Sequence, residues 1–417
     1  MYKSFFIIAV FLPFILLSCQ QQKTPENQPT MQDWQWRGEH RDGIYNETGL
    51  LKEWPADGPE LLWSYEGLGD GHTSVAISNE KIYVTGMRED SLLLLYVFDM
   101  AGNKLAEKEI GKEWNKNWNG TRSSVCINDG KLYIFSALGE LYCLDEATLN
   151  TVWTKNILTD FDGRNLEFGM AENPLIVGDK IFMTPGGIVN NMIALNKNTG
   201  ELIWTSPGLG ATSAYCSPQL ITGYDVPIIV TNFLTHIIGF NADTGEMLWS
   251  YPQESKYGVH PNTLLYDDGK IFSSVCGGAG AMLLRLSDDG RSVELAWKNE
   301  MDNEKGGYVK VGDCVYGTGD DNRAFFCIDW QTGETKYRER EIAPGPVIAA
   351  DGMIYCYDEP GKVYLIAPNP ERLEVVSSFD VPLGTNQHWA HPVIYDGVLY
   401  IRHGDALMAY QIKNKEK

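Results

Sequence analysis

Eight short polar segments recur along the chain, each directly before a run rich in aliphatic residues. In order they read DGHTS, NGTRSS, FGMAEN, TSAYCS, YGVHPN, KGGYVK, APGPV and NQHWAHP. Their side chains are the best candidates for chemistry: His72, Asn119, Arg122, Glu172, Tyr215, His260, Asn262, Tyr308, His388, Trp389 and His391. If the segments meet, they form a polar and aromatic pocket suited to a glycan, a peptide loop or a small ligand. Imidazoles with ordinary pKa values would make binding depend on pH near neutrality.

Patterns typical of catalysis are weak by comparison. The sequence has no nucleophile elbow, no phosphate-binding loop and no cluster of histidines and carboxylates at metal-ligand spacing. Seven cysteines lie within apolar or alternating runs, and none is adjacent to another: Cys126, Cys143, Cys216, Cys276, Cys314, Cys327 and Cys356. We predict that they are small buried hydrophobic residues. One oxidised pair is the alternative in an exported protein.

The elements that must position these segments form a repeat. Eight hairpin patterns, such as SVCINDGKLYIFS, place two short runs rich in Val, Ile and Tyr around a turn of Gly, Asp or Asn. A third apolar run and a fourth strand follow seven of them, while the eighth unit ends after its third strand. The missing fourth strand matches residues 60–66 at the other end of the chain. The sequence therefore predicts an all-β, eight-bladed β-propeller, closed by pairing of residues 60–66 with residues 405–412.

One turn recurs between the third and fourth strands. It reads Asn or Asp, two residues, Thr-Gly, three residues and an aromatic residue, as in NKNTGELIW and NADTGEMLW. Glycine allows the positive φ of such a turn, and the Asx and Thr side chains can bond the backbone around it. We predict that the aromatic residues dock between blades, and these are Trp63, Trp153, Trp204, Trp249, Trp297 and Tyr337.

These turns and tryptophans resemble the tryptophan-docking motifs of the pyrroloquinoline-quinone-type propellers. The resemblance covers nearly all of residues 55–412 and implies eight blades, with each tryptophan docked on the next blade. Such propellers include quinoprotein alcohol dehydrogenases and the propeller lipoprotein of the bacterial outer-membrane assembly machinery. The motif is specific for the fold and not for the cofactor.

The resemblance implies what a quinone site would need. In the dehydrogenases the quinone lies between a tryptophan and a ring made by two adjacent cysteines, and Ca²⁺ with carboxylate and amide ligands polarises it. This sequence has no adjacent cysteines and no C-x-x-C-H for an attached haem. Glu172, Asn262 and Asp302 stand in a suitable chain order for the Ca²⁺ ligands and base. We expect no cofactor, with pyrroloquinoline quinone and Ca²⁺ as the alternative.

The N-terminus is typical of an exported, lipid-anchored protein. An apolar run too short to span a bilayer ends in Leu-Leu-Ser-Cys, which resembles the lipobox of bacterial lipoproteins. We predict a signal peptide at 1–18, lipidation of Cys19 with a flexible tether over 19–32, one propeller domain over 33–412 and a tail at 413–417. Residues 33–59 are expected to wrap an outer face of the ring. Trp34, Trp36 and Trp54 should pack beneath the blades, a sugar-binding platform being the alternative.

The charge of the chain argues against two classes of binding partner. The formal net charge of −21 argues against nucleic acid and against anionic lipid headgroups as ligands. The leading hypothesis is a monomeric, membrane-tethered and non-enzymatic scaffold that binds a partner protein in the cell envelope, as the resemblance to the assembly lipoprotein implies. Its expected location is the outer membrane, on the periplasmic or the surface side. The alternatives are an exported quinoprotein dehydrogenase for alcohols or sugars, and a glycan-binding module.

Overall fold

The computed structural model describes residues 1–2 and 34–414, and regular structure there consists of β-strands. The predicted lipidation at Cys19 and the tether over 19–32 lie outside the described residues. Within the described ranges no helix is long or apolar enough to cross a membrane.

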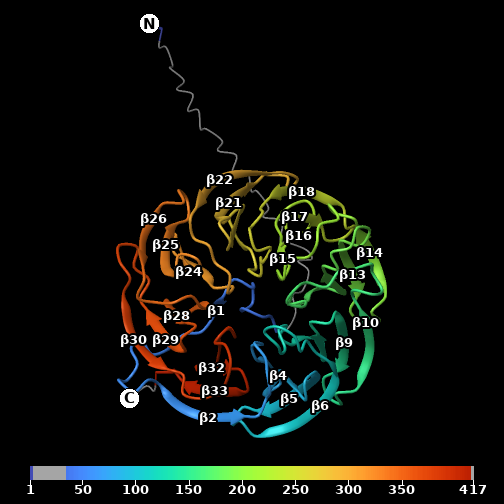
Figure 1. Ribbon diagram of the computed structural model, residues 1–417. Helices are drawn as coiled ribbons and strands as arrows, with labels where there is room; N and C mark the ends of the chain where they lie inside the picture. The colour runs from blue at the N-terminus through green and yellow to red at the C-terminus, as the bar shows by residue number, and fades with distance from the viewer. Residues whose placement is uncertain (3–33, 415–417) are drawn as a thin grey trace.

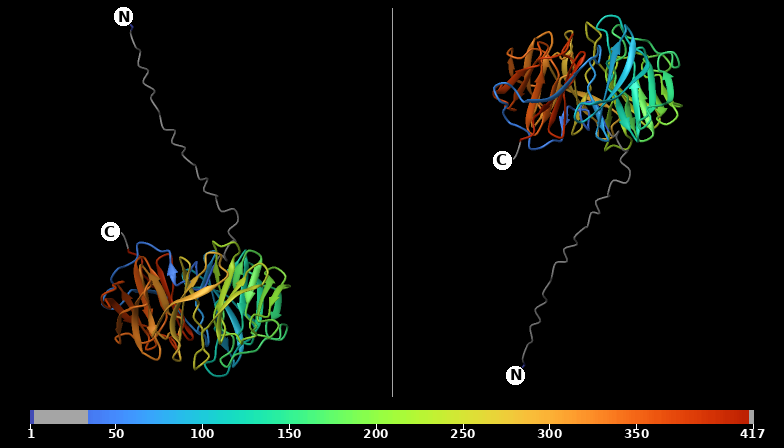
Figure 2. Two further views of the ribbon diagram at one scale, coloured as in Figure 1. Left: turned by 90° about the horizontal axis from the view of Figure 1, so that it is seen from above. Right: turned by 90° about the horizontal axis from the view of Figure 1, so that it is seen from below.

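Eight antiparallel sheets stand radially around a central axis, as the resemblance implied (Figure 1). Seen edge-on, they form a flat disc (Figure 2). The strands of each blade are given from the innermost outward. Blade 1 consists of β3 (Ala76–Ser78), β4 (Lys81–Arg88), β5 (Leu92–Asp99) and β6 (Lys104–Lys112), and blade 2 of β7 (Cys126–Asn128), β8 (Lys131–Phe135), β9 (Glu140–Asp145) and β10 (Thr151–Asn156). Blade 3 consists of β11 (Leu175–Val177), β12 (Lys180–Met183), β13 (Met192–Asn196) and β14 (Leu202–Ser206), and blade 4 of β15 (Gln219–Ile221), β16 (Ile228–Asn232), β17 (His236–Asn241) and β18 (Met247–Pro252).

The remaining blades follow the same order. Blades 5 to 7 are β19 (Leu265–Asp267), β20 (Lys270–Val275), β21 (Gly280–Leu286) and β22 (Val293–Asn299); β23 (Tyr308–Val311), β24 (Cys314–Gly319), β25 (Ala324–Asp329) and β26 (Thr335–Glu339); and β27 (Val347–Ala350), β28 (Met353–Tyr357), β29 (Lys362–Ile366) and β30 (Val375–Asp380). Blade 8 is β31 (Val393–Tyr395), β32 (Val398–His403), β33 (Ala406–Gln411) and β2 (Glu60–Glu66). A short strand, β1 (Ile44–Tyr45), pairs in parallel with β27 on the inner side of blade 7.

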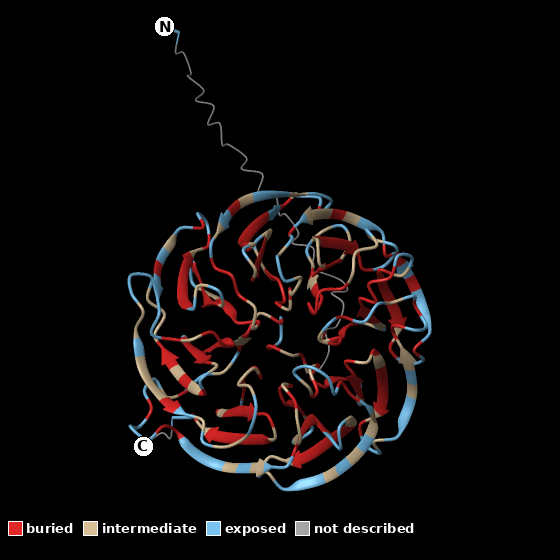
Figure 3. Ribbon diagram, in the orientation of Figure 1, coloured by how far each residue is buried: buried red, intermediate tan, exposed pale blue. Residues whose placement is uncertain are grey.

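The predicted closure is confirmed. Strand β2 pairs antiparallel with β33, from Glu60 opposite Gln411 to Glu66 opposite Ala406. The last blade is therefore built from both ends of the domain, and unfolding of either end exposes the edge of the other. The middle strands of every blade are buried on both faces, whereas the outermost strands are half exposed (Figure 3).

The repeated turn has the predicted chemistry. Asn196 Oδ1 accepts the backbone N–H groups of Asn198 and Thr199 at 2.9 and 3.2 Å, and Thr199 Oγ1 accepts the N–H of Glu201 at 3.2 Å. The glycine that follows, Gly200, has a φ of 70°. The same bonds recur in blades 4 and 6.

A β-bulge aims each docking residue. In blade 3, Trp204 lies opposite Ala194 and Leu202 opposite Leu195, so Ile203 has no partner in the ladder. A bulge re-aims the next side chain, which here lies on the turn glycine of the following blade. A Cβ at Gly245 would lie 2.5 Å from the Trp204 ring, so only glycine fits there. The Trp204 indole N–H donates to the carbonyl of Ala242 at 3.1 Å.

Docking on the next turn glycine is shared by four of the six predicted residues. Trp63, Trp153 and Trp297 also lie on such a glycine and donate to a carbonyl of that turn at 3.0 to 3.1 Å. Trp249 is an exception. Its ring covers Gly239 of its own blade, its indole N–H has no partner, and Tyr224 occupies the space beside Gly290 in blade 5.

Two of the predicted docking residues, Trp249 and Tyr337, join neighbouring blades by apolar packing alone. Trp249 belongs to an apolar cluster shared by blades 4 and 5, and Tyr337 to one shared by blades 6 and 7. The Tyr337 hydroxyl also lacks a partner. Both residues therefore join neighbouring blades by packing, as predicted, but neither contacts the next turn, because the turns of blades 5 and 7 lack the Thr-Gly pattern.

The prediction that residues 33–59 wrap an outer face of the ring is wrong for residues 34–45. They enter the central channel, and β1 lies near the axis of the ring (Figure 1). The cause is two buried arginines, which find backbone carbonyls at the inner ends of several blades. Arg41 donates to the carbonyls of Asn173 and Pro218 at 3.1 Å each, and also to that of Pro174.

The second arginine binds the opposite side of the channel. Arg37 donates to the carbonyl of Tyr308 at 2.7 Å, to that of Gly306, and to Nδ1 of His391 at 3.0 Å. The two guanidinium groups thus connect blades 3 and 4 with blades 6 and 8. Burial lowers the pKa of Arg41 to about 10, so this cation stays charged at neutral pH. The lead-in is a plug that fixes the inner ends of the blades.

The two kinds of docking residue predict different costs of losing an indole N–H. Trp204→Phe breaks the bond to the carbonyl of Ala242, whereas Trp249→Phe breaks none. We expect Trp204→Phe to lower the free energy of unfolding by about 1 kcal/mol more than Trp249→Phe. Denaturant unfolding of both variants checks this difference. Equal destabilisation would show that the indole bond contributes nothing to docking.

Candidate functional site

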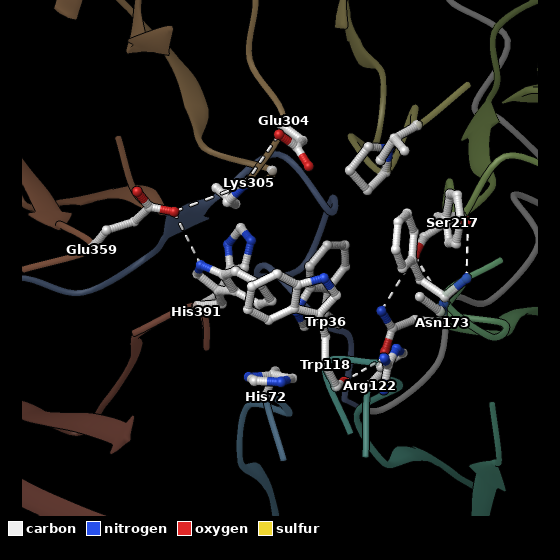
Figure 4. A pocket seen from close by; sticks show the side chains of 17 residues that line it. Trp36, His72, Trp118, Arg122, Asn173, Ser217, Glu304, Lys305, Glu359 and His391 are labelled. Carbon is white, nitrogen blue, oxygen red and sulfur yellow. Dashed lines mark hydrogen bonds and ion pairs between the residues drawn. The ribbon is translucent and has the colours of Figure 1, made fainter. Parts of the chain in front are cut away.

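A pocket of about 430 Å³ opens at one face of the central channel (Figure 4). Its lining is predominantly aromatic and apolar, with a few charged groups at the edge. The lining residues are Trp36, His72, Trp118, Arg122, Phe168, Ala171, Asn173, Tyr215, Ser217, Val259, Pro261, Glu304, Lys305, Gly306, Glu359, Trp389 and His391. We call it the mouth pocket.

Most of the lining comes from the segments that enter the innermost strands. Seven of the eight interblade links contribute, and only the link before β27 does not. The plug supplies Trp36, and the turn between β28 and β29 supplies Glu359. The predicted convergence of the links on one face is therefore observed.

Aromatic rings form one wall of the pocket. Trp389 contacts the rings of both Trp118 and His72, with centroids 5.3 and 5.1 Å apart. Trp36 lies edge-on to His391 at 4.9 Å, on the side of the pocket that the plug supplies. The prediction that Trp36 packs beneath the blades is wrong, because the plug turns it into the channel. Trp54 does pack, between Tyr355 and Phe379.

Charged groups form a second wall around one lysine. Lys305 Nζ lies 3.1 Å from Glu304, 3.5 Å from Asp320 and 3.8 Å from Glu359. Burial would lower the pKa of Lys305, but these carboxylates raise it. Burial raises the pKa of Asp320 to about 7 despite the lysine. The lysine charge is thus neutralised within the wall.

A braced loop carries Trp118 to the rim. Arg122 donates to the carbonyl of Gly120 at 2.6 Å and to that of Asn117 at 3.3 Å. The indole N–H of Trp114 also donates to the carbonyl of Asn117, at 3.0 Å. Trp118 itself is 49% exposed. The loop therefore holds a large exposed ring in a fixed position.

Five of the predicted site residues line the mouth pocket, and six do not. His72, Arg122, Tyr215, Trp389 and His391 are in the lining. The other six make contacts within the protein. Glu172 accepts from Thr184, Asn262 donates to the carbonyls of Ser274 and Asn303, and Tyr308 donates to the carbonyl of Thr263. His260 forms a hydrogen bond with Ser255, His388 stacks on His403, and Asn119 donates to Asp70.

The expected titration of the mouth histidines near neutral pH is not found. Burial lowers the pKa of His72 to about 3, and those of His260 and His388 to about 4. Burial, helped by Arg37, holds the pKa of His391 well below its ordinary value. All four imidazoles are therefore neutral at physiological pH.

Sequence reasoning missed the charged wall. Lys305 is the first residue of the predicted segment KGGYVK but was not chosen as a site residue, and Glu304 directly precedes that segment, so extending it by one residue would have included Glu304. Glu359 lies in a hairpin turn of blade 7, and no signal in the sequence places it near the mouth. Its position depends on the ring geometry alone.

The proposed Ca²⁺ ligands do not form a site. Both oxygens of Glu172 accept from Thr184, and Asp302 accepts from the Asp321 backbone and from Asn322. Asn262 donates through its amide nitrogen, while its buried Oδ1 has no partner. None of the three lines the mouth pocket, and no cysteine does. Among residues 1–2 and 34–414, no group of three or more His, Cys, Asp or Glu side chains is arranged to hold a metal ion. The donor set does not fit a quinone with Ca²⁺. The seven cysteines predicted to be buried are buried, and none of them forms a disulfide bond within the described part of the chain.

A buried acid supports the loop that carries Trp118. Glu113 Oε1 accepts the backbone N–H groups of Trp114 and Ala137 at 2.8 and 2.9 Å, while Oε2 has no partner. Burial raises the pKa of Glu113 to about 7, against these hydrogen bonds. The folded protein therefore retains a proton that the unfolded chain, with an ordinary pKa of 4.5, releases.

This raised pKa predicts a pH-dependent variant. Because the pKa of Glu113 is higher in the folded protein than in the unfolded chain, the free energy of unfolding of the wild type decreases as the pH rises between these two pKa values. Glutamine at this position does not titrate, so the variant does not lose this stability. We expect Glu113→Gln to gain on the order of 3 kcal/mol relative to wild type between about pH 4.5 and pH 7. Denaturant unfolding across this range measures it, with the exposed Glu109→Gln as control. Parallel pH curves for Glu113→Gln and wild type would contradict the assignment.

Known structures share this fold. The BamB structure from Moraxella catarrhalis is 15% identical, with a TM-score of 0.61, covering 86% of this chain and 99% of that one. The quinohemoprotein alcohol dehydrogenase of Comamonas testosteroni is 13% identical, with a TM-score of 0.62, covering 91% and 80%. At such identities these likenesses show the fold alone.

Sequence similarity to curated proteins is confined to one segment. A quinoprotein ethanol dehydrogenase of Pseudomonas aeruginosa is 33% identical over 85 residues, which is 20% of this chain and 13% of that enzyme. A family model described as outer membrane protein assembly factor BamB matches residues 160–372, a little over half of the chain. With its eight blades and docked tryptophans, the chain belongs to this BamB-type family of pyrroloquinoline-quinone-like propellers.

Proposed function

We propose that the protein is a non-enzymatic scaffold of the cell envelope, lipid-anchored through Cys19, that binds a component of outer-membrane protein assembly. Membership of the BamB-type family supports this class of function. The observation that carries it is a rigid, exposed apolar surface on the same face as the mouth pocket. We call this surface, formed by Ile188, Val189 and Leu209, the apolar tip.

The apolar tip exposes a large hydrophobic area. Ile188 is 66% exposed, Val189 61% and Leu209 44%. Ile188 and Val189 lie between β12 and β13, and Leu209 lies in the link from β14 to β15. The two segments touch, since a Cβ at Gly210 would be 3.6 Å from Ile188 Cα. Contiguous exposed apolar side chains are typical of protein-binding surfaces.

A single carboxylate holds the apolar tip in place. Asp162 accepts the backbone N–H groups of Ile188, Val189 and Asn190 at 3.1 to 3.2 Å, and the Asn190 amide at 2.6 Å. Burial alone would raise the pKa of Asp162, but these bonds hold it below its ordinary range. A pre-ordered loop loses little conformational entropy when it binds. The tip is thus built to present its apolar side chains to a partner.

Crosslinking in intact envelopes, with identification of the captured protein, tests the proposal. Ile188→Asp with Val189→Asp should reduce crosslinking to an outer-membrane assembly component by about tenfold or more, since a buried apolar contact of this size is worth at least ~1.4 kcal/mol. Leu105→Asp, at an equally exposed position on β6, is the control and should change little. Equal crosslinking by both variants, or no assembly component among reproducible partners, would refute the scaffold role.

The second candidate is an exported quinoprotein dehydrogenase, favoured by the 85-residue similarity to the ethanol dehydrogenase. It requires the quinone and Ca²⁺ to bind within a propeller whose Glu172, Asn262 and Asp302 serve internal contacts. The scaffold proposal predicts that adding pyrroloquinoline quinone and Ca²⁺ leaves the melting temperature unchanged. It also predicts no dye-linked oxidation of alcohols. A rise in melting temperature together with turnover would replace the scaffold by the enzyme.

A further inference from the structure

We propose that the mouth pocket binds a neutral oligosaccharide, with a pyranose ring lying against Trp118 and hydroxyl groups bonded to Glu304 and Glu359. This goes beyond the scaffold role and does not depend on it, because the apolar tip and the mouth pocket share no residue.

Backbone strain at the pocket is the first observation. Trp118 and Tyr215 have φ angles of 50° and 70°, and they are the two aromatic residues with positive φ in the described part of the chain. Both line the mouth pocket. A bulky residue in this conformation costs about 1–3 kcal/mol and persists where the surroundings hold it. Two strained aromatic residues at one pocket indicate that the position of their rings matters for binding.

Two neighbouring side chains hold Trp118 and its loop in place. The guanidinium of Arg122 bonds carbonyls of the loop, and Trp389 supports the ring from within the pocket. Trp118 remains half exposed, so one part of its surface is open to a ligand. Aromatic faces carry negative potential and attract the weakly positive C–H groups of a sugar ring.

The charges of the pocket disfavour an anionic ligand. Its lining contains two cations, Lys305 and Arg122. Lys305 is neutralised by three carboxylates, and Arg122 donates to backbone carbonyls. Lys305 is therefore already paired, and Arg122 directs three of its five N–H groups to loop carbonyls, which leaves few donors for a phosphate, a sulfate or an acidic sugar. The chain as a whole carries a formal net charge of −21, which repels anions further.

A cationic ligand is disfavoured for a different reason. The place that an ammonium group would take, between carboxylates and over an indole face, is already filled by Lys305. Its Nζ lies 5.2 Å from the centroid of Trp389. A second cation there would have to displace this lysine or lie beside it.

Uncharged hydroxyl groups can bind to the exposed carboxylate oxygens at the edge of the pocket. The side chains of Glu304 and Glu359 are 35% and 29% exposed at the pocket edge, and carboxylate oxygens accept several hydrogen bonds each. Glu359 Oε1 accepts the indole N–H of Trp389 at 3.2 Å, which links the acceptor to the aromatic wall. An apolar wall beside hydroxyl acceptors matches the two faces of a pyranose, and about 430 Å³ is within the range of ligand pockets.

Isothermal titration calorimetry of the purified protein tests this inference. The probes are maltotriose, cellotriose, mannotriose and triacetylchitotriose, with trigalacturonate as the anionic and trilysine as the cationic comparison. We expect at least one neutral trisaccharide to bind with a Kd between about 10 μM and 1 mM, and neither charged probe to bind more tightly. Trp118→Ala should weaken this binding about tenfold or more, and Glu304→Gln severalfold.

Matched variants separate this site from the rest of the surface. Tyr257→Ala removes a ring that is 51% exposed in the link between blades 4 and 5 but does not line the pocket, so saccharide affinity should be unchanged. Ile188→Asp with Val189→Asp should also leave it unchanged, and Trp118→Ala should leave partner crosslinking intact. The inference is overturned if no neutral trisaccharide binds at about 10 mM. It is equally overturned if Trp118→Ala has no effect, or if trilysine or trigalacturonate is the preferred probe.

Discussion

Closure of the ring is the constraint on which the remaining structure depends. Strand β2 completes the blade begun by β31, so the two ends of the domain are joined through backbone hydrogen bonds. Once the ring is closed, the interblade links must converge at one end of the channel. Each blade then buries its two faces against its two neighbours, and the docked tryptophans bury the outer part of these contacts. The mouth pocket exists because eight similar blades share one axis.

The plug resolves a problem that closure creates. An eight-bladed ring has a channel at its axis, and the carbonyls at the inner ends of its blades need hydrogen-bond donors there. Arg37 and Arg41 supply the donors and carry Trp36 into the channel. The lead-in therefore supplies one side of the pocket lining through Trp36. Segments far apart in sequence, near residues 36, 118, 305 and 389, meet there.

Much of the fold could be predicted from local pattern. Hairpin patterns, the Thr-Gly turns and the displaced strand at Trp63 each report short-range chemistry, and together they specify eight blades and their closure. The residues of the candidate site were harder to predict from the sequence. His72 and Trp389 were found because they lie in the links, but Glu172 and Asn262 lie in links too and serve internal hydrogen bonds. Whether a side chain in a link points into the pocket or into the protein depends on contacts with neighbouring blades, and the spacing of residues in the sequence does not predict those contacts.

The sequence by itself determined the strand pattern, the turn chemistry and the ring closure, because each depends on residues adjacent in the chain or on a repeat that recurs along it. Only the tertiary structure decided that Trp249 packs without a turn contact, that Trp36 enters the channel and that Lys305 is neutralised by Asp320 and two glutamates. It also decided that the mouth histidines are neutral. These properties arise from burial and from contacts between distant blades, which exist only after the ring has closed.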